Sequence, residues 1–473
     1  MGMMIKNTKL AVMLILLWAT AMNLSSAQTQ GELSVPNERQ LAWQQAELGM
    51  VFHYDLHVFD STKYNQSVNR LSPVPDYNIF NPTELDVEQW VLAAKSAGAT
   101  FALLTATHET GFALFQSEYN PYSLKAVNWR DGKGDIVRDF VDACRKHGIK
   151  PGIYLGIRWN SFFGVHDFKV DGTGVMQQKR QAYYNRMVEG MLTEICTNYG
   201  DLVEIWFDGG ASSPDKGAPD VLPIVRKYQP NALFYHNDQL AEARWGGSET
   251  GTVGYPNWST FPFKFTSSGE GAPVEISKNS FALLKHGDPD GKFWVPAMAD
   301  APLRGHAGRH EWFWEPDDEK HIYPLSALVD MYYKSVGRNA TLIIGLTPDN
   351  RGLMPDADVK RLKEFGDEIS RRFKKPLASA SGTGSSLELA IPTGQPINQL
   401  LLQENIALGH RVKKFRVEVR KNKKWITVHE ASSIGHKYIH RFEKPVQGDK
   451  IRIIVEERFA EPAFLQFSVY HIQ

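Results

Sequence analysis

One carboxylate of this chain stands where a buried strand would end. The run Leu-Val-Glu-Ile-Trp-Phe at 202–207 is almost entirely apolar, and Asp208 follows it directly, before Gly209 and Gly210. A parallel strand holds a side chain rigidly at its end, and a rigid carboxylate can act as the nucleophile in glycosyl transfer. An aspartate that only caps the next turn would give the same pattern. Spacing alone leaves both interpretations open.

Other polar or aromatic side chains also stand at or just past the ends of predicted strands. They are His53, His108, Trp159, His236 and Asp300. In a barrel of alternating strands and helices, the loops that follow the strands meet at one end, and active sites are built there. Six such residues in the same register, counting Asp208, indicate one shared site.

The elements that would position these residues alternate along the chain from about residue 40 to 370. Apolar residues recur at helical spacing in segments 86–97, 135–147, 183–195, 220–228 and 325–336. Short apolar runs that predict strands occupy 100–106, 151–157, 202–207, 232–235, 293–298 and 341–346. Repeated strand–helix units of this length predict an α/β fold, with a TIM-like (β/α)-barrel over residues 35–374.

The pattern changes after about residue 376. Short alternating or β-branched runs separated by turns occupy 387–391, 399–403, 414–419, 425–429, 437–442, 450–455 and 465–471. Such runs predict an all-β sandwich. We expect this second domain to span 376–473, and the segment 376–384, rich in Ser, Gly and Ala, to be the linker.

The first 27 residues have the pattern of a signal peptide. Lys6 and Lys9 precede an apolar run at 10–19 that is too short to span a bilayer, and Ser25, Ser26 and Ala27 offer small residues for cleavage. The expected mature protein is exported to the periplasm or the extracellular space, without membrane insertion.

Charge and cysteine content exclude several function classes. Lys+Arg and Asp+Glu both total 53, so the net charge is zero and a nucleic-acid partner is not expected. Cys144 and Cys196 fall on the apolar faces of predicted helices, where free cysteines behave as small hydrophobic residues. No ligand cluster has metal spacing and no glycine fingerprint follows a first strand, so neither a metal nor a cofactor is expected. Nothing in the sequence predicts an oligomeric state.

Several motifs together resemble one enzyme family. Trp206-Phe207-Asp208-Gly209 resembles the nucleophile motif of the α-L-fucosidases, glycoside hydrolase family 29. Further segments resemble the family's other signatures in the same order, and the glutamate segment and the downstream sandwich resemble the branch that acts on α-1,3/1,4-linked fucose. These segments are 49–53, 104–112, 131–137, 152–156, 245–251, 257–259 and 332–339.

The resemblance implies a retaining exo-glycosidase that removes terminal α-L-fucosyl residues from oligosaccharides or glycoconjugates. Asp208 would be the nucleophile, and a second carboxyl group about 5 Å away would be the acid/base. Glu249 is favoured for that role, with Glu242, Glu270 and Glu275 in the same loop region as alternatives. The resemblance and the strand ends together predict a sugar-binding set of His53, Asp55, His108, Glu109, Trp159, Arg304 and Trp314.

Five positions depart from the family pattern, namely Asp55, Thr107, Glu109, Thr110 and Tyr255, and two of them introduce a carboxylate at the expected sugar site. Glu109 stands where relatives have the second of two histidines, and Asp55 stands where they have glycine. An ionised carboxylate only accepts hydrogen bonds, whereas a histidine can donate one, so the sugar preference is expected to differ if both face the substrate. Two alternatives therefore remain open. They are a glycosidase of the same fold for a related sugar such as α-L-galactose, and a glycan-binding protein without activity.

Overall fold

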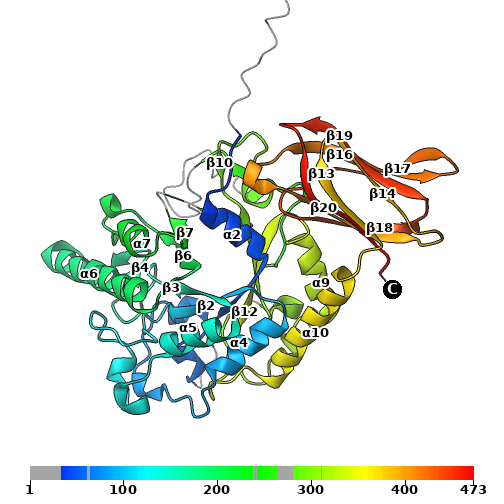
Figure 1. The fold of residues 1–473 in the computed structure, drawn as a ribbon. Helices are drawn as coiled ribbons and strands as arrows, with labels where there is room; N and C mark the ends of the chain where they lie inside the picture. Colours follow the sequence, from blue (N-terminus) through cyan, green and yellow to red (C-terminus); the bar gives the residue numbers. More distant parts are fainter. Residues whose placement is uncertain are drawn as a thin grey trace, which may run out of the picture.

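The structure is a computed structural model that describes residues 33–60, 64–237, 240, 242–263, 281–309 and 312–472. The predicted signal peptide, Glu270 and Glu275 lie outside these residues. Within them, no helix has both the length and the apolar character needed to cross a membrane. Figure 1 shows two parts, a barrel with helices around it and a smaller β domain at its side.

Eight parallel strands form the sheet of the barrel, in the order β7-β6-β3-β2-β1-β12-β11-β8. Every neighbouring pair in this sheet is parallel, and the sheet is nearly closed. The predicted TIM-like barrel is therefore confirmed. The strands are β1 (Leu48–Phe52), β2 (Phe101–Thr107), β3 (Lys150–Leu155), β6 (Glu204–Ala211), β7 (Leu233–Asn237), β8 (Arg244–Trp245), β11 (Ala297–Pro302) and β12 (Ala340–Leu346).

Helices cover the outside of the barrel (Figure 1). Local signals fix their ends: the Asp135 side chain accepts a hydrogen bond from the Arg138 amide at the start of α5, and Gly148 ends that helix with φ 72°. Cys144 and Cys196 lie buried and unpaired on α5 and α6, as predicted. The outer helices are α4 (Val87–Ser96), α5 (Ile136–His147), α6 (Gly174–Asn198), α7 (Leu222–Tyr228), α9 (Leu325–Lys334) and α10 (Asp356–Phe373).

Alternation along the strands separates an inner from an outer face. One cluster of buried residues packs against the helices, and a second, smaller cluster fills the barrel. Trp206 and Met298 belong to the inner cluster, so Asp208 and Asp300, two positions further along, point the same way. Near the start of β6, Glu204 accepts a hydrogen bond from the indole of Trp43 in α2 (Glu38–Ala46) at 2.8 Å. The strand period thus carries two carboxyl groups to the carboxyl end of the barrel.

The predicted strand at 293–298 is two strands in the structure. β10 (Phe293–Trp294) pairs antiparallel with β9 (Thr260–Phe261), and β11 begins only at Ala297. Pro296 separates them, and a proline lacks the N–H that a continuous ladder needs. The apolar run was predicted correctly as extended, but it serves two different sheets.

Two four-stranded antiparallel sheets form the C-terminal part, in the orders β13-β20-β15-β18 and β14-β19-β16-β17. Their buried side chains form a core of their own, as expected for a sandwich. The strands are β13 (Ala378–Thr383), β14 (Ser386–Ala390), β15 (Ile397–Glu404), β16 (Val412–Lys421), β17 (Lys424–Ser432), β18 (Tyr438–Val446), β19 (Lys450–Arg458) and β20 (Ala463–Tyr470).

The segment predicted as a linker is mostly a strand. β13 pairs antiparallel with β20 at the edge of its sheet. Its small side chains alternate between half-buried and exposed, and none is fully buried. Backbone pairing forms this strand, which is why its composition did not predict it.

Polar contacts join the sandwich to the barrel. Glu47, just after α2, accepts hydrogen bonds from His436 at 2.7 Å and from Lys437 at 2.5 Å. The Tyr333 hydroxyl of α9 donates to the side chain of Gln399 in β15. Among the described residues, none of the sandwich lines the pocket described next.

Candidate active site

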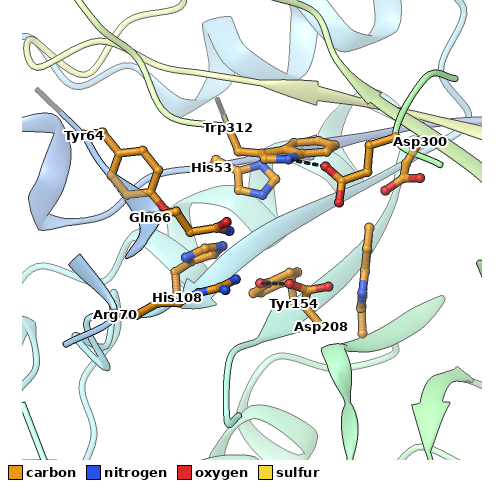
Figure 2. A pocket seen from close by; sticks show the side chains of 11 residues that line it. His53, Tyr64, Gln66, Arg70, His108, Tyr154, Asp208, Asp300 and Trp312 are labelled. Atoms are coloured by element: carbon orange, nitrogen blue, oxygen red, sulfur yellow. Dashed lines mark hydrogen bonds between the residues drawn. The ribbon is translucent and has the colours of Figure 1, made fainter. Parts of the chain in front are cut away.

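A pocket with an empty volume of about 600 Å³ opens at the carboxyl end of the barrel (Figure 2). Of the predicted residues it brings together Asp208, Glu249, His53 and His108, together with Asp300, which was singled out as a strand end. The complete lining is His53, Tyr64, Gln66, Arg70, His108, Tyr154, Trp206, Asp208, Glu249, Asp300 and Trp312.

Asp208 sits on a bulge of β6. The register with β7 shifts between Trp206 and Ala211, and both glycines that follow the aspartate have positive φ, 66° and 94°. A Cβ on Gly209 would lie only 2.7 Å from the side chain of Arg158. The Asp208 carboxylate is exposed, and Tyr154 donates a hydrogen bond to its Oδ2 at 3.2 Å. The two glycines therefore explain how a strand-end carboxylate can face open space in the pocket.

Glu249 reaches the pocket from the loop after β8. The indole of Trp312 donates a hydrogen bond to its Oε2 at 2.9 Å, and the Gly251 amide binds the backbone carbonyl of Asp300 at 2.8 Å. Trp312 packs closely against Gly345 of β12, where a Cβ would lie 2.4 Å from its ring. The loop is thus held by β11, and the carboxylate of Glu249 by Trp312, which packs on β12.

The alternative glutamate that the structure describes has a different environment. Glu242 is 2% exposed and forms ion pairs with Arg39 at 2.6 Å and Arg226 at 2.7 Å. Its second oxygen also accepts the Phe234 amide at 2.8 Å. It does not line the pocket. Glu242 is therefore a structural carboxylate that anchors α2 and α7 to β7.

Asp300 is a third carboxyl group in the pocket. The indole of Trp245 donates to its Oδ1 at 3.0 Å. Burial raises its pKa well above the usual value, and the nearby charges of Glu249 and Asp208 raise it further. Burial and the two neighbouring carboxylates therefore favour the protonated form of Asp300, which can donate as well as accept a hydrogen bond.

Two neutral histidines line the inner wall. Burial lowers the pKa of His53 to about 3 and that of His108 well below its usual value. The His108 ring stacks on Tyr154 with centroids 5.2 Å apart, and His53 lies 5.0 Å from Trp312. A neutral imidazole has one donor and one acceptor, so both rings can bind sugar hydroxyls without adding charge.

Five residues of the predicted sugar-binding set do not line the pocket. They are Asp55, Glu109, Trp159, Arg304 and Trp314. Arg304 is 1% exposed and forms a bidentate ion pair with Asp358, at 3.0 and 2.6 Å. This ion pair joins α10 to the loop after β11. Trp314 packs against the barrel core, and Trp312 occupies the pocket instead. These two predicted sugar contacts have no support in the geometry.

Asp55 is part of the protein interior. Its carboxylate accepts the Thr110 hydroxyl at 2.7 and 2.8 Å and the Leu56 amide at 2.6 Å, and so caps the short helix η1 (Leu56–Val58). Burial raises its pKa to about 7. The expectation that this carboxylate faces the sugar is corrected: it ties the loop after β1 to the loop after β2.

Replacing Asp55 should alter how stability depends on pH. The pKa of Asp55 is about 7 in the folded protein and 3.8 for an ordinary aspartate. As pH rises, the unfolded chain therefore loses this proton before the folded protein does. The group therefore lowers the free energy of unfolding as pH rises from about 4 to about 7. The free energy of unfolding of wild type should therefore fall by about 2.7 kcal/mol between pH 5 and pH 8 through this group, and Asp55→Asn should lack that fall. Urea unfolding of both proteins at pH 5 and pH 8 measures this change. A difference in the free energy of unfolding between the two proteins that is the same at both pH values would contradict the raised pKa of Asp55.

Several pocket residues were not predicted as site residues. Tyr154 and Trp206 lie on predicted strands, and the alternation of inner and outer positions could have found them, because Trp206 is two residues before Asp208. Tyr64, Gln66 and Arg70 come from a loop segment that carries no periodic pattern or motif. Only tertiary structure brings that segment to the pocket.

Comparisons with known proteins agree on one family. The model of the α-L-fucosidase family matches residues 29–371. α-L-fucosidase 1 of Arabidopsis thaliana is 28% identical over 93% of this chain and 88% of its own length. A crystal structure from Bacteroides thetaiotaomicron, provisionally named an α-L-fucosidase, is 58% identical, covers 93% of this chain and 100% of its own, and superposes with a TM-score of 0.90. A glycoside hydrolase 29 member from a rumen bacterium is 30% identical over 93% of this chain and 78% of its own, with a TM-score of 0.76.

The family match spans the whole barrel, and the structural likeness extends through the sandwich. A glycoside hydrolase of this kind acts on glycans. The chain belongs to the α-L-fucosidase family, glycoside hydrolase family 29.

Proposed function

We propose that the chain is a retaining exo-α-L-fucosidase in which Asp208 is the nucleophile and Glu249 the acid/base. One observation carries this proposal. Asp208 on β6 and Glu249 on the loop after β8 line the same pocket, and each accepts a hydrogen bond from an aromatic side chain. Retaining glycosidases need two such carboxyl groups on either side of the scissile bond.

The reaction then has two steps. The Asp208 carboxylate attacks the anomeric carbon of the fucosyl group while Glu249 gives its proton to the departing glycosidic oxygen, and an ester between the sugar and Asp208 results. Glu249, now a carboxylate, takes a proton from water, and the hydroxide formed attacks the same carbon and releases Asp208. Two inversions restore the α configuration of the product.

The released anomer tests the stereochemical part. Proton NMR during the first minutes of hydrolysis of an aryl α-L-fucoside should show α-L-fucose first, before mutarotation equilibrates the two anomers. Initial formation of β-L-fucose would require a single displacement by water and would remove the nucleophile role from Asp208.

Terminal α-1,3/1,4-linked fucose is the proposed preference, and an exported location is proposed with it. The sequence motif around Glu249 and the downstream sandwich support the linkage, and the predicted signal peptide supports export. Rates on fucosyl oligosaccharides with α-1,2, α-1,3, α-1,4 or α-1,6 linkages test the first point, and the N-terminal residue of the protein recovered from its host tests the second. Faster cleavage of α-1,2 or α-1,6 linkages, or an uncleaved N-terminus, would contradict them.

The case for a different sugar is weaker than the sequence suggests. The expectation for α-L-galactose rested on Asp55 and Glu109 as added acceptors at the sugar, but neither carboxylate lines the pocket. Both are bonded to protein groups instead. The departures from the family motif are therefore compatible with a pocket for fucose.

A further inference from the structure

We propose that Glu109 is a positioning residue, which holds Arg70 in the pocket wall so that the guanidinium donates hydrogen bonds to the bound sugar. This inference rests on the proposed function, because it requires the pocket around Asp208 to be the active site. It assigns a role to a carboxylate that stands where the family has a histidine, and to an arginine outside every motif.

The contacts of Glu109 point away from the sugar and toward one segment. The Glu109 carboxylate is 5% exposed and belongs to the loop after β2. Its Oε1 accepts Arg70 Nε at 2.6 Å and Gln66 Nε2 at 3.2 Å, and its Oε2 accepts the Tyr64 hydroxyl at 2.8 Å. All three donors line the pocket, whereas Glu109 does not.

The segment that Glu109 binds has little apolar anchoring of its own. Its short helix α3 (Gln66–Asn69) has no buried residue. The Tyr64 ring packs 4.9 Å from Phe313, which fixes the start of the segment only. Charge-assisted hydrogen bonds are roughly twice as strong as neutral ones, so the Glu109 carboxylate is the main contact that places Gln66 and Arg70.

Arg70 is left with donors for a ligand. Its Nε is used by Glu109 and its guanidinium lies 4.8 Å above the ring of Trp159, two contacts that fix the plane of the group. Its side chain remains 28% exposed, and among the described residues it makes no further hydrogen bond. Arginine has five N–H donors and no acceptor, so the remaining donors suit the hydroxyl or ring oxygens of a sugar.

The position of Tyr64, Gln66 and Arg70 also adds hydrogen-bond donors to the pocket. Asp208 and Glu249 supply acceptors, and Figure 2 shows Tyr64, Gln66 and Arg70 on the side of the pocket opposite Asp300. Together the two sides offer a sugar both donors and acceptors. A site that satisfies each hydroxyl discriminates strongly against sugars that leave a buried polar group unpaired.

A double-mutant cycle on an aryl α-L-fucoside tests the proposal. Arg70→Ala should raise KM by roughly tenfold with kcat changed much less, because it removes a contact made in both the bound substrate and the transition state. Glu109→Ala should raise KM by a similar factor, since Arg70 is then no longer held. The double variant should be no worse than the poorer single one, because both changes remove the same contact.

The controls separate positioning from general damage. Glu194→Ala removes another carboxylate that anchors a loop, through Ser117 and the Glu118 amide at 2.8 Å each, but outside the pocket lining; KM should be unchanged. If Glu109→Ala does not fold, Glu109→Gln takes its place in the test. It keeps the size of the side chain and one acceptor, so it should fold and raise KM by a smaller factor than that expected for Glu109→Ala. Additive effects of the Arg70 and Glu109 changes, or a normal KM in both Glu109 variants, would overturn the proposal. Normal activity in Asp208→Ala would instead refute the proposed function.

Discussion

Asp208→Ala should lower kcat on an aryl α-L-fucoside by at least roughly a thousandfold, because the covalent route is lost as a unit. The fold should survive, since the Asp208 side chain is exposed and its removal costs only the hydrogen bond from Tyr154. Steady-state kinetics and a thermal melt of the same preparation measure both effects.

Asp215 provides the matched control for this change. It is exposed on the short helix η5 (Pro214–Lys216), seven residues further along the chain, and does not line the pocket. Asp215→Ala should therefore keep both rate and melting temperature. Near-normal turnover in Asp208→Ala, or equal losses in the two variants, would refute the nucleophile assignment.

Glu249→Ala should have a second large effect, and the size of the effect should depend on the leaving group. Substrates with a poor leaving group, such as fucosyl oligosaccharides, should lose roughly a hundredfold or more, because only they need a proton on the departing oxygen. Activated aryl fucosides should lose much less in the first step. Added azide should restore part of their rate, because azide attacks the Asp208 ester in place of water without needing a base, and the product should be a fucosyl azide of α configuration.

The configuration of that azide follows from the proposed sequence of steps. Asp208 inverts the anomeric carbon once, giving a β-linked ester, and azide in place of water would invert it again to the α-azide. Formation of a β-azide would mean that azide displaced the leaving group directly. The expected product of Glu249→Ala acting through the Asp208 ester is therefore the α-azide, and the β-azide is expected only where Asp208 is also removed. Equal losses on both substrate types, with no effect of azide, would assign the acid/base role to another carboxyl group.

The barrel and its strand ends could be predicted from the sequence because both follow from local periodicity. Trp206 and Asp208 share a face since strands have a period of two, and the paired glycines with positive φ mark the bulge that exposes the carboxylate. Asp300 was found in the same way. These features depend on neighbours in the chain.

The rest of the site depends on contacts that no local pattern records. Asp55 and Arg304 were predicted at the sugar from their motif positions, but partners distant in the chain, Thr110 and Asp358, draw both side chains into the interior. Arg70 lies in the pocket wall, where Glu109, 39 residues further along the chain, accepts its hydrogen bond. A charged residue at a barrel mouth can bind a ligand or another charge, and the sequence does not distinguish these outcomes.

Trapping the covalent intermediate tests the central assignment most directly. A 2-deoxy-2-fluoro-α-L-fucosyl donor with a good leaving group should slow breakdown of the ester more than its formation, so the sugar remains attached to its nucleophile. Tryptic digestion releases residues 187–216 as one peptide, and because it also contains Glu204, fragmentation must locate the label within it. We expect the fluorosugar on Asp208. A label on Glu204, Glu249 or Asp300, or no label while the enzyme is inactivated, would contradict the assignment of Asp208 as the nucleophile.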